Sequence, residues 1–319
     1  MTWLPGFSLT AEIKIEEVKT MATVKQYELI TASIIEALKA GNIPWQKPWT
    51  GINGKHRNAL SDRGYNGLNP FTLWAVALKR GYESPLWLTV KQAQQLGGSV
   101  IKGQKATPVY FWKFDKVEVE KEDGTKELKT IPFLRISFVF NLEQTENVKL
   151  PTRRNQPDKV ELDFKPVEQA QAIVDYYLAN GGPILNHNGG DRAFYSPSLD
   201  TIALPLREDF HSIDEYYSTA FHELGHSTGH KSRENRFPED AKLAAFGSGE
   251  YSKEELVAEF TSAFLADESG IDTTRENSAA YIQSWLRKLE DDPGLLVTAA
   301  GKAQRAANRI LGTTAKDTK

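Results

Sequence analysis

The spacing of apolar residues predicts both helices and strands in the first half of the chain. Apolar positions recur at helical intervals over residues 24–40, and the same pattern indicates shorter helices over 70–80 and 89–97. Residues 107–114 and the segments KVEVE and PFLRISFVF have the composition of strands, and Asp123-Gly124 indicates a long hairpin between the last two. We therefore expect the first half to be α+β.

The second half of the chain is expected to be mostly helical, with a small sheet early in it. Two short strands are expected around the turn in residues 192–205. Ser212 with Glu215, and Ser252 with Glu255, have the spacing of capping boxes that start two helices. The helices expected here cover residues 166–179, 212–228, 252–270, 275–290 and 294–311.

A polar segment that contains proline separates the two halves, so we expect two domains. The first would cover residues 21–150, the linker 151–162 and the second domain 163–319. Residues 1–20 lack the basic start and apolar core of a secretory signal, and Met21 opens a better helix, so this segment is interpreted as a tail or an upstream-start extension. By default this places the protein in the cytoplasm, and no apolar run is long enough to span a membrane.

Charge is divided unevenly between the two halves. The 319 residues carry a net charge of −3, yet residues 25–113 hold 12 Lys and Arg against 4 Asp and Glu, and residues 151–319 hold 19 against 27. This split indicates two units with different partners, although two faces of one domain would also produce it. Cysteine is absent, so any metal must be held by histidine and carboxylate groups.

The stretch HELGHSTGH, residues 222–230, predicts a metal site. His222 and His226 are four residues apart, which on a helix places both imidazoles on one face. Glu223 lies between them in the HExxH arrangement, where a carboxylate can accept a proton from a metal-activated water, so it is the candidate catalytic residue. The ion would be Zn²⁺ or another divalent metal such as Mn²⁺.

A third ligand must come from elsewhere in the chain. The metzincin pattern would require a histidine at Ser232 and a downstream methionine turn, but the only methionines are Met1 and Met21. A glutamate from a following helix is the other common arrangement. We assign Glu255 as that ligand, with its role in a capping box as the alternative and Glu254 as the second choice.

Other polar groups near the motif are candidates for supporting roles. Glu259 lies in the apolar run LVAEFTSAF and is assigned as the acceptor for the free N–H of a ligand histidine. His230 is best interpreted as a histidine at a helix end. The residues that could stabilise an oxyanion are Tyr195, His211, Tyr217, Tyr251 and His230.

Five of the seven tryptophans fall within the basic stretch of residues 45–112, which is typical of a surface that binds single-stranded nucleic acid. Trp74 and Trp87 are expected in the core, whereas Trp45 and Trp49 lie in the proline-bounded loop IPWQKPWT and are expected to stack on bases. The candidate DNA contacts are Trp45, Lys47, Trp49, Arg57, Arg63, Tyr65, Asn66, Lys79, Arg80, Lys102, Lys105 and Lys113.

Taken in order, the segments IPWQKPW, RGYNGLNPFTLW, SPLWLTVKQAQQLGGSVIKGQK and TPVYFWKF, followed by HELGH and ELVAE, resemble the ArdC-type antirestriction proteins. The first four segments also resemble the start of TraC-type plasmid primases. The resemblance implies an α+β fold with two domains: an α+β single-stranded-DNA-binding domain, and a mostly helical zincin-like metallopeptidase domain with a small sheet.

The resemblance implies an antirestriction protein that binds incoming single-stranded DNA during conjugation and protects it from host nucleases. Double-stranded DNA is a further candidate partner. One alternative is an active DNA-dependent metalloprotease that cleaves host proteins bound to DNA, with an unknown protein substrate. Another is a DNA-binding protein in which the metal only stabilises the fold. Hydrolytic activity is left open, because shielding DNA requires binding and no turnover.

Overall fold

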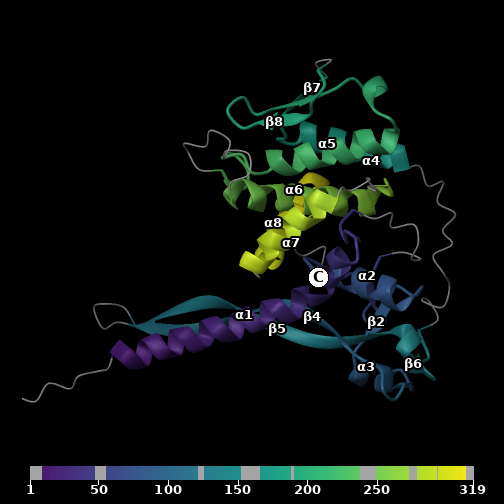
Figure 1. Ribbon diagram of the computed structural model, residues 1–319, viewed down its shortest axis with the longest axis vertical. Coiled ribbons are helices and arrows are strands. Elements are labelled where there is room, and N and C mark those ends of the chain that lie inside the picture. The colour runs from purple at the N-terminus through teal and green to yellow at the C-terminus, as the bar shows by residue number, and fades with distance from the viewer. Residues whose placement is uncertain are drawn as a thin grey trace, which may run out of the picture.

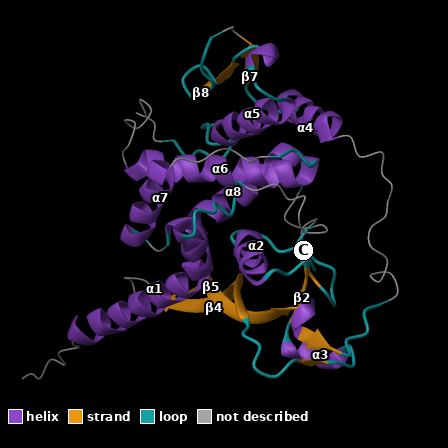
Figure 2. Cartoon of the chain, turned by 45° about the vertical axis from the view of Figure 1, so that its right-hand side comes forward, coloured by secondary structure: helices purple, strands orange, loops and turns teal. Residues whose placement is uncertain are grey.

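The computed structural model describes most of the chain, in eight segments. They are residues 9–46, 55–120, 126–151, 166–187, 190–237, 249–272, 279–292 and 294–313. The expected linker over residues 151–162 lies almost wholly outside these segments. Figures 1 and 2 show a long helix beside a two-stranded ribbon in the first half, and a stack of helices with a small sheet in the second. The chain is therefore α+β, as the sequence predicts.

The first half begins with a helix that is longer than expected. Helix α1 runs without a break from Leu9 to Lys39, so the expected start near Val24 is wrong, and the helix includes residues 9–20 of the segment interpreted as a tail or extension. The elements that follow are β1 Arg57–Asn58, α2 Asn69–Arg80, β2 Leu86–Leu88, α3 Val90–Gln95, β3 Ser99–Val100, β4 Thr107–Glu120, β5 Lys126–Asn141 and β6 Thr145–Glu146. Helix α2 has proline in its first turn and ends at Gly81, whose φ of 69° is a left-handed conformation that glycine adopts without strain.

The long ribbon is the central feature of the first half. Strands β4 and β5 pair antiparallel from Thr107 opposite Val139 to Glu120 opposite Lys126, and the sheet order is β1-β2-β5-β4. Trp87 lies in β2 and is fully buried, as expected, and Trp74 in α2 is 3% exposed. The side chain of Asn69 pairs with the backbone of Tyr110 in both directions, at 2.8 and 2.9 Å, and so attaches α2 to the edge of β4.

The second half is built from helices that cover a three-stranded sheet. Its elements are α4 Pro166–Ala179, β7 Ile184–His187, β8 Phe194–Ser196, β9 Thr201–Leu204, α5 Ile213–Ser227, α6 Gly249–Ser269, α7 Ala279–Asp291 and α8 Leu295–Leu311. Strand β9 lies between β7, which is parallel to it, and β8, which is antiparallel. The two strands around the Ser-Pro-Ser-Leu-Asp turn are thus as expected, and β7 is an addition.

One core connects the two halves. Ile30 and Ile34 of α1 belong to the same buried cluster as Phe71 of α2, Phe260 of α6 and Trp285 of α7. In Figure 1, α1 and α2 lie directly below α6, α7 and α8. The halves that the sequence separates therefore share apolar contacts, and the exact domain boundaries stay a prediction.

Trp45 lies at the centre of this shared core. Its ring is 1% exposed and meets Phe260 edge-on at 5.1 Å between centroids and Trp285 at 6.2 Å. Phe71 stacks on the other side of Phe260 at 4.9 Å. The expectation that Trp45 is exposed and stacks on bases is wrong, because burying a ring of this size against two other aromatic rings is strongly favourable.

Among the described helices, none combines the length and apolar content that crossing a membrane requires.

Replacing Trp45 should therefore affect stability. We expect Trp45→Ala to lower the free energy of unfolding by about 3–5 kcal/mol, because it leaves a large cavity between the halves. Trp112→Ala is a matched control, since that ring is 43% exposed, and its effect should stay within about 1 kcal/mol. Denaturant unfolding followed by circular dichroism measures both variants. Equal destabilisation by the two would contradict this account of the core.

Candidate metal centre

Helix α5 presents two histidines toward α6. Ser212 Oγ accepts a hydrogen bond from Glu215 N at 3.1 Å and starts the helix where the capping pattern predicts. His222 and His226 then lie one turn apart on the same face. Gly225 between them allows α6 to approach closely, because a Cβ at this position would lie 3.1 Å from both Ala258 Cα and Thr261 Cβ.

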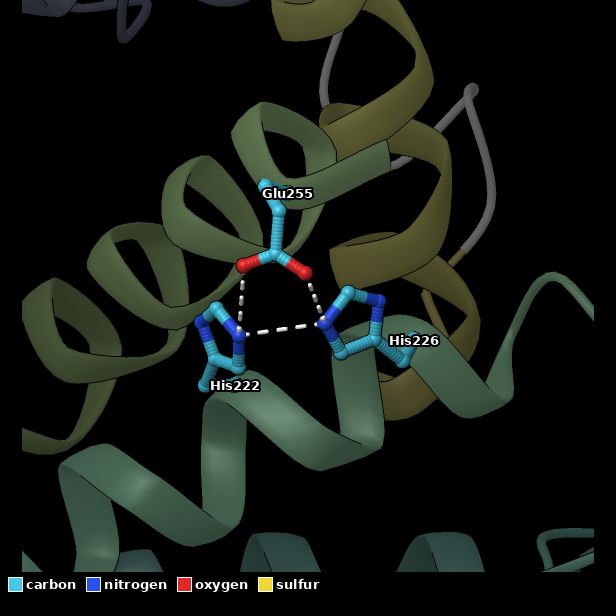
Figure 3. Close-up of side chains that lie close together, drawn as sticks. All are labelled: His222, His226 and Glu255. Carbon is cyan, nitrogen blue, oxygen red and sulfur yellow. Dashed lines mark hydrogen bonds and ion pairs between the residues drawn. The ribbon is translucent and has the colours of Figure 1, made fainter. Parts of the chain in front are cut away.

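Helix α6 supplies the third group of the cluster. It begins at Gly249, upstream of the expected cap at Ser252, so Glu255 lies inside the helix rather than at its first turn. Figure 3 shows the Glu255 carboxylate facing both imidazole rings. One carboxylate oxygen is 3.6 Å from His222 Nε2 and the other is 3.3 Å from His226 Nε2, and the two Nε2 atoms are 3.1 Å apart.

These separations suit a small divalent cation. A tetrahedral ion with bonds of about 2.0–2.1 Å holds its ligand atoms about 3.3 Å apart. In the described part of the chain, His222, His226 and Glu255 form the one group of three His, Asp or Glu side chains whose ligand atoms all lie within 4.8 Å of one another. Imidazole nitrogen with one carboxylate is a donor set that Zn²⁺ and similar ions accept.

Charge interactions within the cluster also favour a cation. Burial lowers the pKa of His226, but Glu254 and Glu255 outweigh this effect and raise that pKa to about 10. Burial raises the pKa of Glu255, but hydrogen bonds from His222 and His226 hold it well below the usual range. The ligand-free cluster therefore retains a proton between its groups, and a metal ion would replace that proton.

A second carboxylate faces His226 from the side away from the cluster. Glu254 Oε1 lies 3.7 Å from His226 Nδ1, and Arg236 holds the same carboxylate at 2.6 and 3.1 Å. Arg236 also donates to the carbonyl of Gly225 at 3.0 Å and to Thr228 Oγ1 at 2.8 Å, so it fixes the end of α5. Glu254, our second choice for third ligand, is thus placed to orient His226, and the sequence analysis did not include Arg236.

Glu259 lies in a small cavity beside His222. Ser218, Ser262 and Ala263 line this cavity together with Trp45, Gln46, His222 and Glu259. Gln46 Nε2 donates to Glu259 Oε2 at 3.1 Å, so a residue from the first half of the chain reaches the surroundings of the metal centre. For His226 the facing carboxylate is Glu254; the assignment of Glu259 to a ligand histidine stays a prediction for His222.

Glu223 and the oxyanion candidates are placed as follows. Glu223 is 7% exposed, between the two histidines on α5, and its charge helps to raise the pKa of His226. Tyr195 donates to Asp200 at 2.8 Å and Tyr217 donates to Gln171 at 2.9 Å, so both hydroxyl groups already have partners. His230 Nδ1 lies 2.7 Å from Ser232 Oγ, His211 is exposed, and the Tyr251 side chain lies outside the described residues.

The candidate DNA contacts are mostly surface residues of the first half. Arg63, Asn66, Lys79, Arg80, Lys102, Lys105 and Lys113 are exposed; Arg57 and Tyr65 are half-buried; Lys47 and Trp49 lie outside the described residues. Several of the cations already have partners. Lys79 pairs with Glu36, Arg57 Nε lies 3.3 Å from Asp62, and Arg80 donates to the carbonyl of Lys105 at 2.8 Å. Burial raises the pKa of Tyr65 to about 12.

The sequence analysis missed a set of exposed aromatic rings on the β4–β5 ribbon. They are Phe111, Trp112, Phe114, Phe133 and Phe138, with exposed fractions from 37% to 67%. Their signal was present in the segment TPVYFWKF, which is rich in aromatic residues, but only the register of the ribbon shows which of them share a face.

Comparison with known proteins now gives the class. The family model described as the N-terminal domain of anti-restriction factor ArdC matches residues 24–140, and the one described as zincin-like metallopeptidase matches residues 172–302. The chain thus joins an ArdC-type N-terminal domain to a zincin-like metallopeptidase domain.

Full-length relatives give the family. ArdC from plasmid R388 is 34% identical in its metal-free and Mn(II)-bound crystal structures, each with a TM-score of 0.68, and the match covers 90% of this chain and 98% or 97% of that one. The uncharacterised protein y4eC of Sinorhizobium fredii (strain NBRC 101917 / NGR234) is 32% identical over 88% of this chain and 90% of its own length. This chain belongs to the ArdC antirestriction family.

The primase relatives are much longer proteins. A DNA primase TraC of Escherichia coli is 38% identical over 91% of this chain, and a second TraC is 40% identical over 89%. The chain spans only 28% and 20% of the lengths of these two proteins.

The zincin-like domain, the Mn(II)-bound relative and the fit of the three side chains support a divalent metal in this family member. We expect Mn²⁺ or Zn²⁺ to raise the melting temperature, by the equivalent of about 2.7 kcal/mol at one hundred times Kd. His222→Ala and Glu255→Gln should abolish this rise, whereas Glu223→Gln should retain it. Differential scanning fluorimetry measures the change, and an undiminished rise in Glu255→Gln would contradict the assignment.

Glu254→Gln should weaken metal affinity about 10–100-fold, because it leaves His226 less firmly oriented.

Proposed function

We propose that this protein binds incoming single-stranded DNA during conjugative transfer and protects it from host nucleases. The observation that carries the proposal is the match to the antirestriction protein ArdC over nearly its whole length, with an ArdC-type N-terminal domain model over residues 24–140. The plasmid origin of that relative supports a setting in conjugation. The primase name of the longer relatives supports DNA as the partner.

The charge distribution supports the same partner. The first half holds the local excess of 12 basic over 4 acidic residues, and Lys102, Lys105 and Arg63 are exposed there. The second half is acidic, which disfavours DNA on that side of the molecule. We assign single-stranded DNA to the first half, with duplex DNA as the weaker partner.

In this proposal the metal centre contributes primarily to the structure. His222, His226 and Glu255 would hold the ion between α5 and α6, and so join α5 to the helix that contributes Phe260 to the shared core. Binding energy for a metal then adds to the stability of the folded state. Shielding a strand requires that the protein stays bound, and it does not require hydrolysis.

DNA binding of this kind should depend steeply on salt. Each phosphate contact contributes about −0.7 to the slope of log affinity against log salt for a single strand. Three or more contacts therefore predict a slope steeper than about −2, with stronger binding to an oligothymidine than to a duplex of equal length. Fluorescence anisotropy of a labelled oligonucleotide at several salt concentrations measures this slope. An affinity that does not change with salt concentration, or an absence of binding, would contradict the proposal.

A second candidate function is metal-dependent proteolysis, and the position of Glu223 favours it. An ion held by the two histidines and Glu255 would supply the polarisation of a water molecule that zincin-type hydrolysis needs. The Glu223 carboxylate, between the two ligands on α5, would accept the proton of that water. Glu223 is buried and the three cluster side chains are half-buried, so the site is only partly open to water.

Hydrolysis is tested directly with DNA-bound proteins as substrates. The Mn²⁺- or Zn²⁺-loaded protein is incubated with a DNA-binding protein on single-stranded DNA, and the products are analysed by mass spectrometry. If the protein acts by shielding DNA alone, the wild-type protein cleaves no peptide bond of the substrate. Cleavage that disappears in Glu223→Ala, with the metal-induced rise in melting temperature intact, would establish the second function instead.

A further inference from the structure

One face of the β4–β5 ribbon carries alternating aromatic and cationic side chains. Phe111 lies opposite Arg135, and Lys113 lies opposite Phe133. Residues directly opposite in an antiparallel pair share a face, as do residues two apart on one strand, at a spacing of about 7 Å. The four side chains therefore form a two-by-two pattern in which each ring has a cation beside it both across and along the strands.

This face is open to solvent where its rings lie. Phe111 is 52% exposed and Phe133 is 37% exposed, and both cations are exposed. At the end of the ribbon where β5 pairs with β2, the same face is covered, because Val109 and Val139 are buried against α2 and Trp87. Phe111 lies outside this buried cluster, and the rings of Phe111 and Phe133 are exposed to solvent. Clustered exposed rings are rare on a monomeric protein surface and commonly mark a binding site.

The opposite face of the ribbon is occupied by the core at the same level. Tyr110 lies opposite Ile136, and both pack into the cluster that contains Ile30 and Ile34 of α1. Tyr110 also accepts a hydrogen bond from Leu68 N at 3.0 Å. In Figure 1, the ribbon runs beside α1, at the other end of the molecule from β7 and β8. At Tyr110 and Ile136 the opposite face is therefore packed against the core, whereas Phe111, the next residue along β4, is exposed.

The charge on this face is suited to an anionic partner. Arg135 is exposed and lies opposite Phe111, so a cation stands beside the ring. Lys113 lies 2.9 Å from Asp115 and is partly neutralised. A partner that combines flat apolar rings with regularly spaced negative charges matches both properties of the face, and single-stranded DNA is such a partner.

We propose that single-stranded DNA lies on this face, with bases stacked on Phe111 and Phe133 and a backbone phosphate contacting Arg135. The inference rests on the proposed function and names the surface that performs it. Stacking accepts every base, so affinity should vary little with sequence. Trp45, which the sequence suggested for this role, is replaced by rings that the ribbon itself exposes.

The ribbon also offers a matched control. Phe114 is the most exposed of these rings, at 67%, but it lies on the other face, opposite Pro132 and without a cation across the strand. Phe114→Ala removes as much exposed aromatic surface from the same strand. A general loss of hydrophobic surface would affect Phe111 and Phe114 alike, whereas our proposal involves only the first.

The test compares full-length variants by fluorescence anisotropy with a labelled oligothymidine. We expect Phe111→Ala with Phe133→Ala to weaken binding at least tenfold without changing the salt slope, because each stacked base contributes well over a factor of three. Phe111→Trp, with Phe133 unchanged, should bind as tightly as wild type, because a tryptophan ring also stacks on bases. Arg135→Ala should weaken binding and make the slope shallower by about 0.7. Phe114→Ala should stay within twofold of wild type. An unchanged melting temperature and metal response show that each variant is folded.

Four results would overturn the assignment. If wild type binds single-stranded DNA and the Phe111 and Phe133 double variant binds equally well, this surface is wrong while the proposed function stands. If Phe114→Ala weakens binding as much as the double variant, the face is not specific. If the double variant changes only the oligomeric state in size-exclusion chromatography with light scattering, the face binds another protein chain. A wild type that does not bind DNA would overturn the proposed function as well.

Discussion

The shared apolar core around α6 is the constraint on which the rest of the structure depends. Phe260 on this helix packs against Trp45 and Phe71 from the first half of the chain, while Glu255 on the same helix faces the two histidines of α5. Moving α6 would therefore disturb both contacts together. Gly225 adds a second requirement, because a Cβ at this position would crowd Ala258 and Thr261 of α6 at 3.1 Å.

This arrangement places the two halves of the protein in direct contact at the metal centre. Gln46, one residue after the buried Trp45, donates to Glu259, and both line the small cavity that contains His222. Lys55 also reaches Glu268 at the far end of α6, at 2.5 Å. The segment that the sequence assigns to DNA binding is thus partly a structural element. The surface suited to a nucleic acid lies instead on the exposed face of the β4–β5 ribbon that carries Phe111 and Phe133.

The sequence predicts the parts of the site that depend on local spacing. His222 and His226 share a face because a helix has 3.6 residues per turn, and Glu255 follows from the absence of cysteine and of the metzincin pattern. Arg236, and the role of Glu254 as its partner, could not be found this way, because their contact depends on how the chain after α5 turns back onto α6. The order of elements was likewise predictable, whereas the upstream start of α1 was not.

Trp45 shows why composition misled the interpretation of the aromatic segment. Prolines around a tryptophan exclude a regular helix, but they say nothing about a ring more than two hundred residues away, and Phe260 lies at that separation. Conversely, Phe111 and Phe133 look like ordinary strand residues until the register places them beside cations. Exposure is a property of tertiary packing, so the rings that bind and the rings that pack could not be separated from the sequence.

The most direct test of the account is a nuclease protection assay on single-stranded DNA coated with wild-type protein or with Glu223→Ala. The account predicts that both protect the strand equally. Shielding depends on DNA binding by the first half, and the second half needs to be folded but not catalytically active. Loss of protection in Glu223→Ala, with DNA binding and the metal-induced rise in melting temperature unchanged, would contradict it, as would an unprotected strand with wild type.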